Sequence, residues 1–271
     1  ARIDTMDTVV DAVNLLKDYS SHDILKDRGE VLGEEDDRTL VHLLTDQIEF
    51  ADIVVLNKVD DATAEQVDSA RKILRSLNAD AQIVQPYISD VPTGKIFVTC
   101  LFDFAKAETH PMWAKELYGF KDHVPETEEY GVTSYTYRAR RPFDPQAIHD
   151  LLNGALPGVI RAKGHFWVAT RPEWLAEFSL AGALSSISPL GTWWASVPQD
   201  RWPDHAGLRD YLEANWEEPW GDRRQENVFI GSGIDWPALE ARLDDALLPD
   251  DFNPEGTELE DPFPIWRKQA E

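Results

Sequence analysis

The residues best suited to bind a ligand are Asn57-Lys58-Val59-Asp60, which directly follow the apolar run ADIVVL at 51–56. The carboxylate of Asp60 can accept two neighbouring N–H donors at once, as a bidentate, charge-assisted pair. Guanine presents two such donors, N1–H and its N2 amine, whereas adenine would leave the carboxylate unpaired. Asn57 can hold the loop and reach N7 of the base, and the aliphatic stem of Lys58 can cover the ring face. The tetrapeptide therefore predicts a guanine-binding loop.

The segments around this tetrapeptide alternate between strand and helix. The run at 51–56 is continuously apolar, as in a strand buried on both faces of a parallel sheet. The capping-box pattern Thr63-Ala64-Glu65-Gln66 predicts that a helix begins after the loop. Further strands are expected at 8–12 and 81–84, with a helix at 39–50. Strand, helix and strand at this spacing predict a parallel α/β sheet.

The pattern changes after about residue 125, where antiparallel strands are expected. We predict strands at 132–140, 159–169, 178–188, 193–197 and 227–231, and helices after Asp144, at 206–216 and after Asp235. In the strand at 159–169, alternation places Ile160 and Ala162 on one face and Arg161, Lys163 and His165 on the other. These elements predict a smaller α+β domain.

The chain is accordingly divided into three parts: an α/β part at 1–125, an α+β domain at 126–250 and an acidic tail at 251–271. Between Asp244 and Asp261 there are eight acidic residues and no basic one. Such a charge run is expected to form a solvated tail.

The form N-K-x-D is the guanine-specificity loop of P-loop GTPases, which also need the phosphate-binding pattern G-x-x-x-x-G-K-[ST]. That pattern is absent from the sequence. The nearest segment, Thr93-Gly94-Lys95-Ile96, has Ile96 in place of the magnesium-binding hydroxyl and Ser89 in place of the first glycine. Because the chain begins at Ala1, we expect it to be the C-terminal part of a longer protein and to be inactive as a GTPase by itself.

Several stretches together resemble the CobW-like P-loop GTPases, a family of zinc metallochaperones and cobalamin-synthesis proteins. The matching stretches are VVDA at 9–12, DQIEFADIVVLNKVD at 46–60, PETEEYGVTSYTYRARRPFDP at 125–145 and GVIRAKGHFWVATR at 158–171. The resemblance implies a GTPase-type parallel sheet that lacks its N-terminal part, followed by the family's C-terminal domain. It also implies binding of GTP with Mg²⁺, slow GTP hydrolysis, and zinc or cobalt handling for a client metalloprotein. Only Asn57, Lys58 and Asp60 carry over as site residues, because the family's phosphate loop and its Cys-x-Cys-Cys metal motif are not in this sequence.

Four other residues are weaker candidates for binding. Asp11 ends a strand at the edge where ligands sit in α/β folds, so it could help to order magnesium or could close a turn. Asn14 stands where some relatives have a metal-binding histidine, which weakens a metal site there. Cys100 is expected to be a small buried side chain, and His165 a sheet-surface residue that could contact a partner. The metal ligands therefore stay unassigned.

Composition limits the possible partners. The chain has 26 basic and 50 acidic residues, a net charge of −24, which argues against nucleic acids and anionic membranes. Eight of the ten tryptophans lie between Trp167 and Trp236; without a basic groove they are expected to be core aromatics rather than base-stacking residues. One cysteine excludes an internal disulfide, and the absence of a signal peptide or long apolar run favours a cytoplasmic protein.

Two functions fit these observations. The first is a GTP-binding metallochaperone, whose metal site or partner surface is switched by the nucleotide. The second is a nucleotide-free interaction or metal-delivery module, in which the C-terminal domain binds a client. The sequence leaves the choice of metal, client and oligomeric state open.

Overall fold

The computed structural model describes residues 3–20, 39–103, 132–249, 252 and 258–267. Its first part is a three-stranded parallel sheet in the order β1-β2-β3. The strands are β1 (Asp7–Asp11), β2 (Ile53–Asn57) and β3 (Gln82–Val84), and the helices are α1 (Leu15–Tyr19), α3 (Leu40–Glu49) and α4 (Ala64–Leu77). A short 3₁₀ helix, η1 (Thr93–Lys95), follows β3. The predicted parallel α/β sheet is confirmed.

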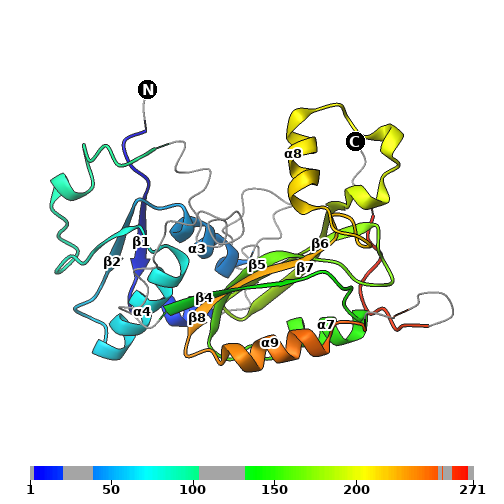
Figure 1. Ribbon diagram of the computed structural model, residues 1–271. Coiled ribbons are helices and arrows are strands. Elements are labelled where there is room, and N and C mark those ends of the chain that lie inside the picture. The colour runs from blue at the N-terminus through cyan, green and yellow to red at the C-terminus, as the bar shows by residue number, and fades with distance from the viewer. Residues whose placement is uncertain (1–2, 21–38, 104–131, 250–251, 253–257, 268–271) are drawn as a thin grey trace.

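The second part is a five-stranded antiparallel sheet in the order β4-β8-β5-β6-β7. Its strands are β4 (Val132–Ala139), β5 (Val159–Phe166), β6 (Trp174–Ala181), β7 (Leu184–Thr192) and β8 (Gln225–Ser232). Helices α7 (Pro145–Asn153) and α9 (Trp236–Asp245) cover one face, and α8 (Ala206–Asn215) stands at the far end (Figure 1). The apolar stripes of α7 and α9 pack with Phe166, Phe178 and Phe229 into one core. The predicted antiparallel α+β part is confirmed.

Two of the predicted strands are wrong. Residues 178–188 are not one strand but the two arms of the β6–β7 hairpin, which turns at Gly182 with a φ of +56°. A β-carbon at Gly182 would lie 2.0 Å from the carbonyl oxygen of Tyr19, so the close approach of α1 requires glycine there. Residues 193–197 include a 3₁₀ helix, η3 (Trp194–Ser196), because the amides of Trp194 and Ala195 turn toward the buried carboxylate of Asp222.

The predicted faces of β5 need one correction. Ala162 lies in the core beneath the sheet, but Ile160, which alternation places on the same face, packs against the core of the α/β part instead. A register shift between Val159 and Arg161 explains the difference, because a β-bulge interrupts the alternation of side chains.

The prediction of a solvated tail is wrong for Asp261, Phe263 and Trp266, whereas Glu258 and Glu260 are exposed as predicted. Phe263 and Trp266 are 6% and 8% exposed and belong to the core of the five-stranded part. Arg171 donates to Asp261 through Nη2 and Nε, at 2.7 and 2.8 Å, and its guanidinium lies over the Trp266 ring. The acidic run is therefore partly neutralised and anchored by aromatic side chains that follow it.

The two sheets meet through one buried ion pair and a shared apolar cluster. The Arg161 guanidinium lies 2.7 Å from the Glu49 carboxylate, with only 5% and 3% of these side chains exposed. The Tyr19 hydroxyl donates to the carbonyl of Ile160, and Ala181 belongs to the core of the α/β part. The boundary predicted at 125/126 lies outside the described residues and stays a prediction. Within the described residues, no helix is long and apolar enough to cross a bilayer.

Candidate functional site

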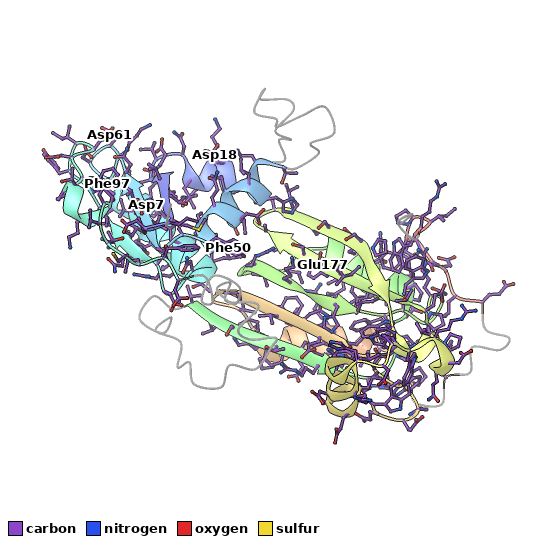
Figure 2. The ribbon with its side chains drawn as sticks, turned by 90° about the horizontal axis from the view of Figure 1, so that it is seen from above. Asp7, Asp18, Phe50, Asp61, Phe97 and Glu177 are labelled. Carbon is purple, nitrogen blue, oxygen red and sulfur yellow. The ribbon has the colours of Figure 1, made fainter. Side chains whose placement is uncertain are left out.

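The predicted guanine loop lies at the carboxyl edge of the parallel sheet, where three strands end together. Asp11 at the end of β1 is in register with Asn57 at the end of β2, and the amide of Ala12 donates to the Asn57 carbonyl at 2.9 Å. The segment after β3 returns to the same edge, since the Ser89 hydroxyl reaches Asn57. Figure 2 shows Asp61, which follows the loop, on the α/β part and away from the five-stranded sheet. Ligands of open α/β sheets bind at this edge.

Local interactions fix the two ends of the loop. Before it, β2 is buried along its length, which leaves Asn57 at the rim. After it, Thr63 and Gln66 form the predicted capping box, with both side-chain-to-backbone hydrogen bonds present. Between these anchors Asp60 is exposed, and its carboxylate can therefore meet a ligand from solution.

Lys58 is held in an unusual conformation by Asp11. Its backbone is left-handed, with a φ of 58°, and its ammonium lies 2.7 Å from Asp11 Oδ2. This ion pair and its hydrogen bond raise the pKa of Lys58. Burial alone would raise the pKa of Asp11, but hydrogen bonds from Lys58, Asn14 and the Val13 amide outweigh burial and lower it. Both groups are therefore charged at neutral pH.

Ser89 is a site residue that the sequence analysis did not assign. Its hydroxyl donates to Asn57 Oδ1 at 2.9 Å, so the amide nitrogen of Asn57 faces away from this contact. Ile88 and Ser89 both have left-handed backbones, with φ of 48° and 59°. Its position in the sequence could have identified it, because Ser89 follows a predicted strand that ends at the same sheet edge as Asn57.

The residues present do not fit a magnesium site. Asp11, the one carboxylate considered for that role, already accepts hydrogen bonds from the Lys58 ammonium, two backbone amides and the Asn14 side chain. It closes a turn, which was the alternative left open by the sequence. Among the described residues, no group of three or more His, Cys, Asp or Glu side chains could hold a metal ion.

Two further candidates differ from expectation. Cys100 is exposed rather than buried, with a left-handed φ of 54°, and its amide donates to Asp4. His165 lies on the predicted face of β5, but its ring packs edge-on against Trp193 and lies 3.4 Å from Glu226, with 15% of its side chain exposed. His165 is therefore largely covered, and neither residue lies in the guanine loop.

Comparison with known proteins supports one family. The chain is 40% identical over 253 residues to "Zinc-regulated GTPase metalloprotein activator 1" of Dictyostelium discoideum, covering 92% of the chain and 53% of that protein. It is 29% identical over 244 residues to "Zinc chaperone Rv0106" of Mycobacterium tuberculosis, covering 87% of the chain and 58% of that protein. The chain thus spans about half the length of the curated relatives it matches.

A solved structure, the Zn(II)-bound YjiA GTPase from E. coli, matches at a TM-score of 0.35 and 17% identity, over 90% of this chain and 61% of that one. A likeness of this size adds nothing about function. Two family models match successive segments: the CobW/HypB/UreG nucleotide-binding domain over residues 1–85, and the C-terminal domain of the cobalamin synthesis protein CobW over residues 132–247. With both models matched in order and the guanine loop inside the first, the chain belongs to the CobW family.

Proposed function

We propose that this chain is the guanine-reading and C-terminal part of a GTP-binding metallochaperone that handles zinc. The observation that carries the proposal is the Asn57–Asp60 loop at the carboxyl edge of the sheet, with an exposed carboxylate between two fixed anchors. The names of the two relatives, a zinc-regulated GTPase metalloprotein activator and a zinc chaperone, supply zinc as the metal. We extend the proposal to cobalt as an alternative metal, to a client metalloprotein that receives the metal, and to a location in the cytoplasm.

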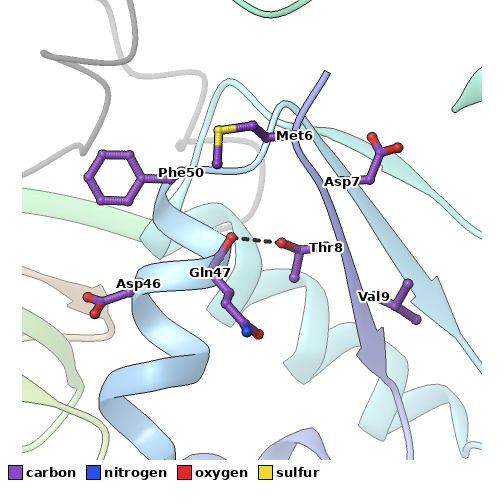
Figure 3. Close-up of a pocket in the computed structure, with 7 residues that line it drawn as sticks. All are labelled: Met6, Asp7, Thr8, Val9, Asp46, Gln47 and Phe50. Carbon is purple, nitrogen blue, oxygen red and sulfur yellow. Dashed lines mark hydrogen bonds between the residues drawn. The ribbon is translucent and has the colours of Figure 1, made fainter. Parts of the chain in front are cut away.

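The open edge of β1 supports a site that is completed by another segment. In the described residues β1 pairs only with β2, and its other side borders a hollow of about 550 Å³. The hollow is lined by Met6, Thr8, Val9, Gln47 and Phe50, among others, and Thr8 donates to the Gln47 carbonyl within it (Figure 3). Val9 is 65% exposed there. An apolar edge of this kind accepts a further strand, and a phosphate-binding segment placed there would lie beside the guanine loop.

A titration of the isotope-labelled chain tests base recognition directly. We expect millimolar guanosine monophosphate to shift the amide NMR signals of residues 57–63, and adenosine monophosphate to shift them much less. The base alone should bind weakly, because phosphate contacts supply most of the affinity for a nucleotide. Equal responses to both nucleotides, or none, would refute guanine recognition by this loop and would favour the nucleotide-free interaction module.

A further inference from the structure

The carboxylate of Asp11 divides its two oxygens between two tasks. Oδ1 accepts from the amides of Val13 and Asn14, at 2.8 and 3.2 Å, and so closes the turn into α1. Oδ2 accepts from the Lys58 ammonium at 2.7 Å and from the Asn14 side chain at 2.9 Å. One oxygen therefore serves its own turn alone, and the other is shared between the Asn14 side chain and the loop of the neighbouring strand.

Lys58 needs such a hold. Left-handed backbone is unfavourable for a residue with a β-carbon, yet Lys58 has a φ of 58° between Asn57 and Val59. Its side chain is still 49% exposed, so burial alone does not fix it. The ion pair ties the free end of the side chain to β1, and the Asp61 amide donates to the Lys58 carbonyl at 3.2 Å. These two contacts fix the position of the turn that carries Asp60 relative to Asp11.

We propose that Asp11 is a positioning residue for guanine recognition, which acts by holding Lys58. With the ammonium fixed, the aliphatic stem of Lys58 keeps one direction and can cover the base, while Asp60 stays exposed to pair with it. This inference rests on the proposed function of the loop. Asp11 does not touch the nucleotide in this role, and its effect passes through Lys58.

Replacing Asp11 by asparagine separates the two tasks of the carboxylate. Asp11→Asn keeps a side-chain oxygen that can accept from the backbone N–H groups of Val13 and Asn14. It places an uncharged NH₂ group where Oδ2 accepts from Lys58. The matched control is Asp68→Asn, which removes the same charge from an exposed pair with Lys72 on α4. The two backbone hydrogen bonds of the turn into α1 are thus retained, whereas the Asn14 side-chain contact and the charged link to the guanine loop are lost.

The test is a cycle of variants titrated with guanosine monophosphate and followed by the NMR signals of the loop. We expect Asp11→Asn to weaken binding about tenfold, Asp68→Asn to leave it unchanged, and Asp11→Asn to have no further effect when Lys58→Met is present. Wild-type affinity in Asp11→Asn would overturn the positioning role of Asp11, as would effects of Asp11→Asn and Lys58→Met that add in full. Either result would leave the proposed function of the loop standing. Absence of a guanine-specific response in the unaltered chain would refute the proposed function, and this inference with it.

Discussion

The buried pair between Glu49 and Arg161 should be the most sensitive polar contact between the two sheets. Glu49 ends α3, Arg161 lies on β5, and their side chains are 3% and 5% exposed. Glu49→Gln keeps the shape of the side chain but leaves the guanidinium charge buried without its carboxylate. Removing one member of a buried pair costs about 3–5 kcal/mol.

The structure places Glu49→Gln near the lower end of that range. Arg161 also donates to the Ser179 hydroxyl at 2.9 Å and to the Leu180 carbonyl at 3.1 Å, which continue to satisfy part of the guanidinium. We therefore expect a loss of about 3 kcal/mol in the free energy of unfolding, which corresponds to a fall of about 6–12 °C in Tm. Urea unfolding followed by tryptophan fluorescence and circular dichroism measures it.

Two comparisons make this prediction specific. Asp68→Asn, which breaks an exposed pair, should change stability by less than about 0.5 kcal/mol. Replacing both members, by Glu49→Leu with Arg161→Met, should recover much of the loss, because no charge is then left buried. If Glu49→Gln were as stable as the unaltered chain, the two sheets would not depend on this contact and the reasoning would be refuted.

Three further predictions concern other parts of the chain. The 271 residues alone should show no GTP hydrolysis, and calorimetry should detect no micromolar GTP affinity; such an affinity would contradict the need for a phosphate loop. Trp266→Ala should lower the free energy of unfolding by about 3 kcal/mol, the low end for a buried aromatic, and an unchanged urea midpoint would mean that the tail is not anchored. Although burial opposes it, the His165 ring and Arg224 hold the pKa of Glu226 at about 2. The stabilisation from this carboxylate is therefore complete above its unfolded pKa near 4.5 and is lost as pH falls toward 2; Glu226→Gln should remove that acid-dependent loss in unfolding curves between pH 6 and 3.

Features encoded by neighbouring residues were predictable from the sequence. The strand at β2, the loop at 57–60 and the capping box at Thr63 follow one another within 14 residues, from Ile53 to Gln66, and the structure contains each of them. Asp144 and Asp235 likewise cap α7 and α9, as their positions before proline-containing helix starts predict. Such signals depend on backbone hydrogen bonds over a few residues, so they need no distant contact to form.

Features that depend on distant contacts were not predictable in this way. The ion pair of Glu49 with Arg161 joins residues 112 apart, and Ser89 reaches Asn57 from 32 residues away. The hairpin turn at Gly182 has apolar neighbours, so only its contact with Tyr19 reveals why glycine is needed. The charge pattern of the acidic run near the C-terminus predicted a solvated tail. It could not show that Asp261 forms an ion pair with Arg171, which is 90 residues earlier in the chain.

The measurement that tests the central claim most directly is a competition between guanine and xanthine nucleotides for Asp60→Asn. The chain would be combined with the phosphate-binding segment of a CobW relative, supplied in trans, and titrated with a fluorescent guanine nucleotide against GTP and xanthosine triphosphate. Xanthine carries a carbonyl where guanine carries its N2 amine, so an amide at position 60 suits xanthine better. We expect Asp60→Asn to weaken GTP binding by at least about 2 kcal/mol, as for the loss of a charge-assisted pair, and to improve binding of the xanthine nucleotide relative to GTP. If Asp60→Asn kept the unaltered preference for GTP, the loop would be an ordinary turn and the account of guanine recognition would be wrong.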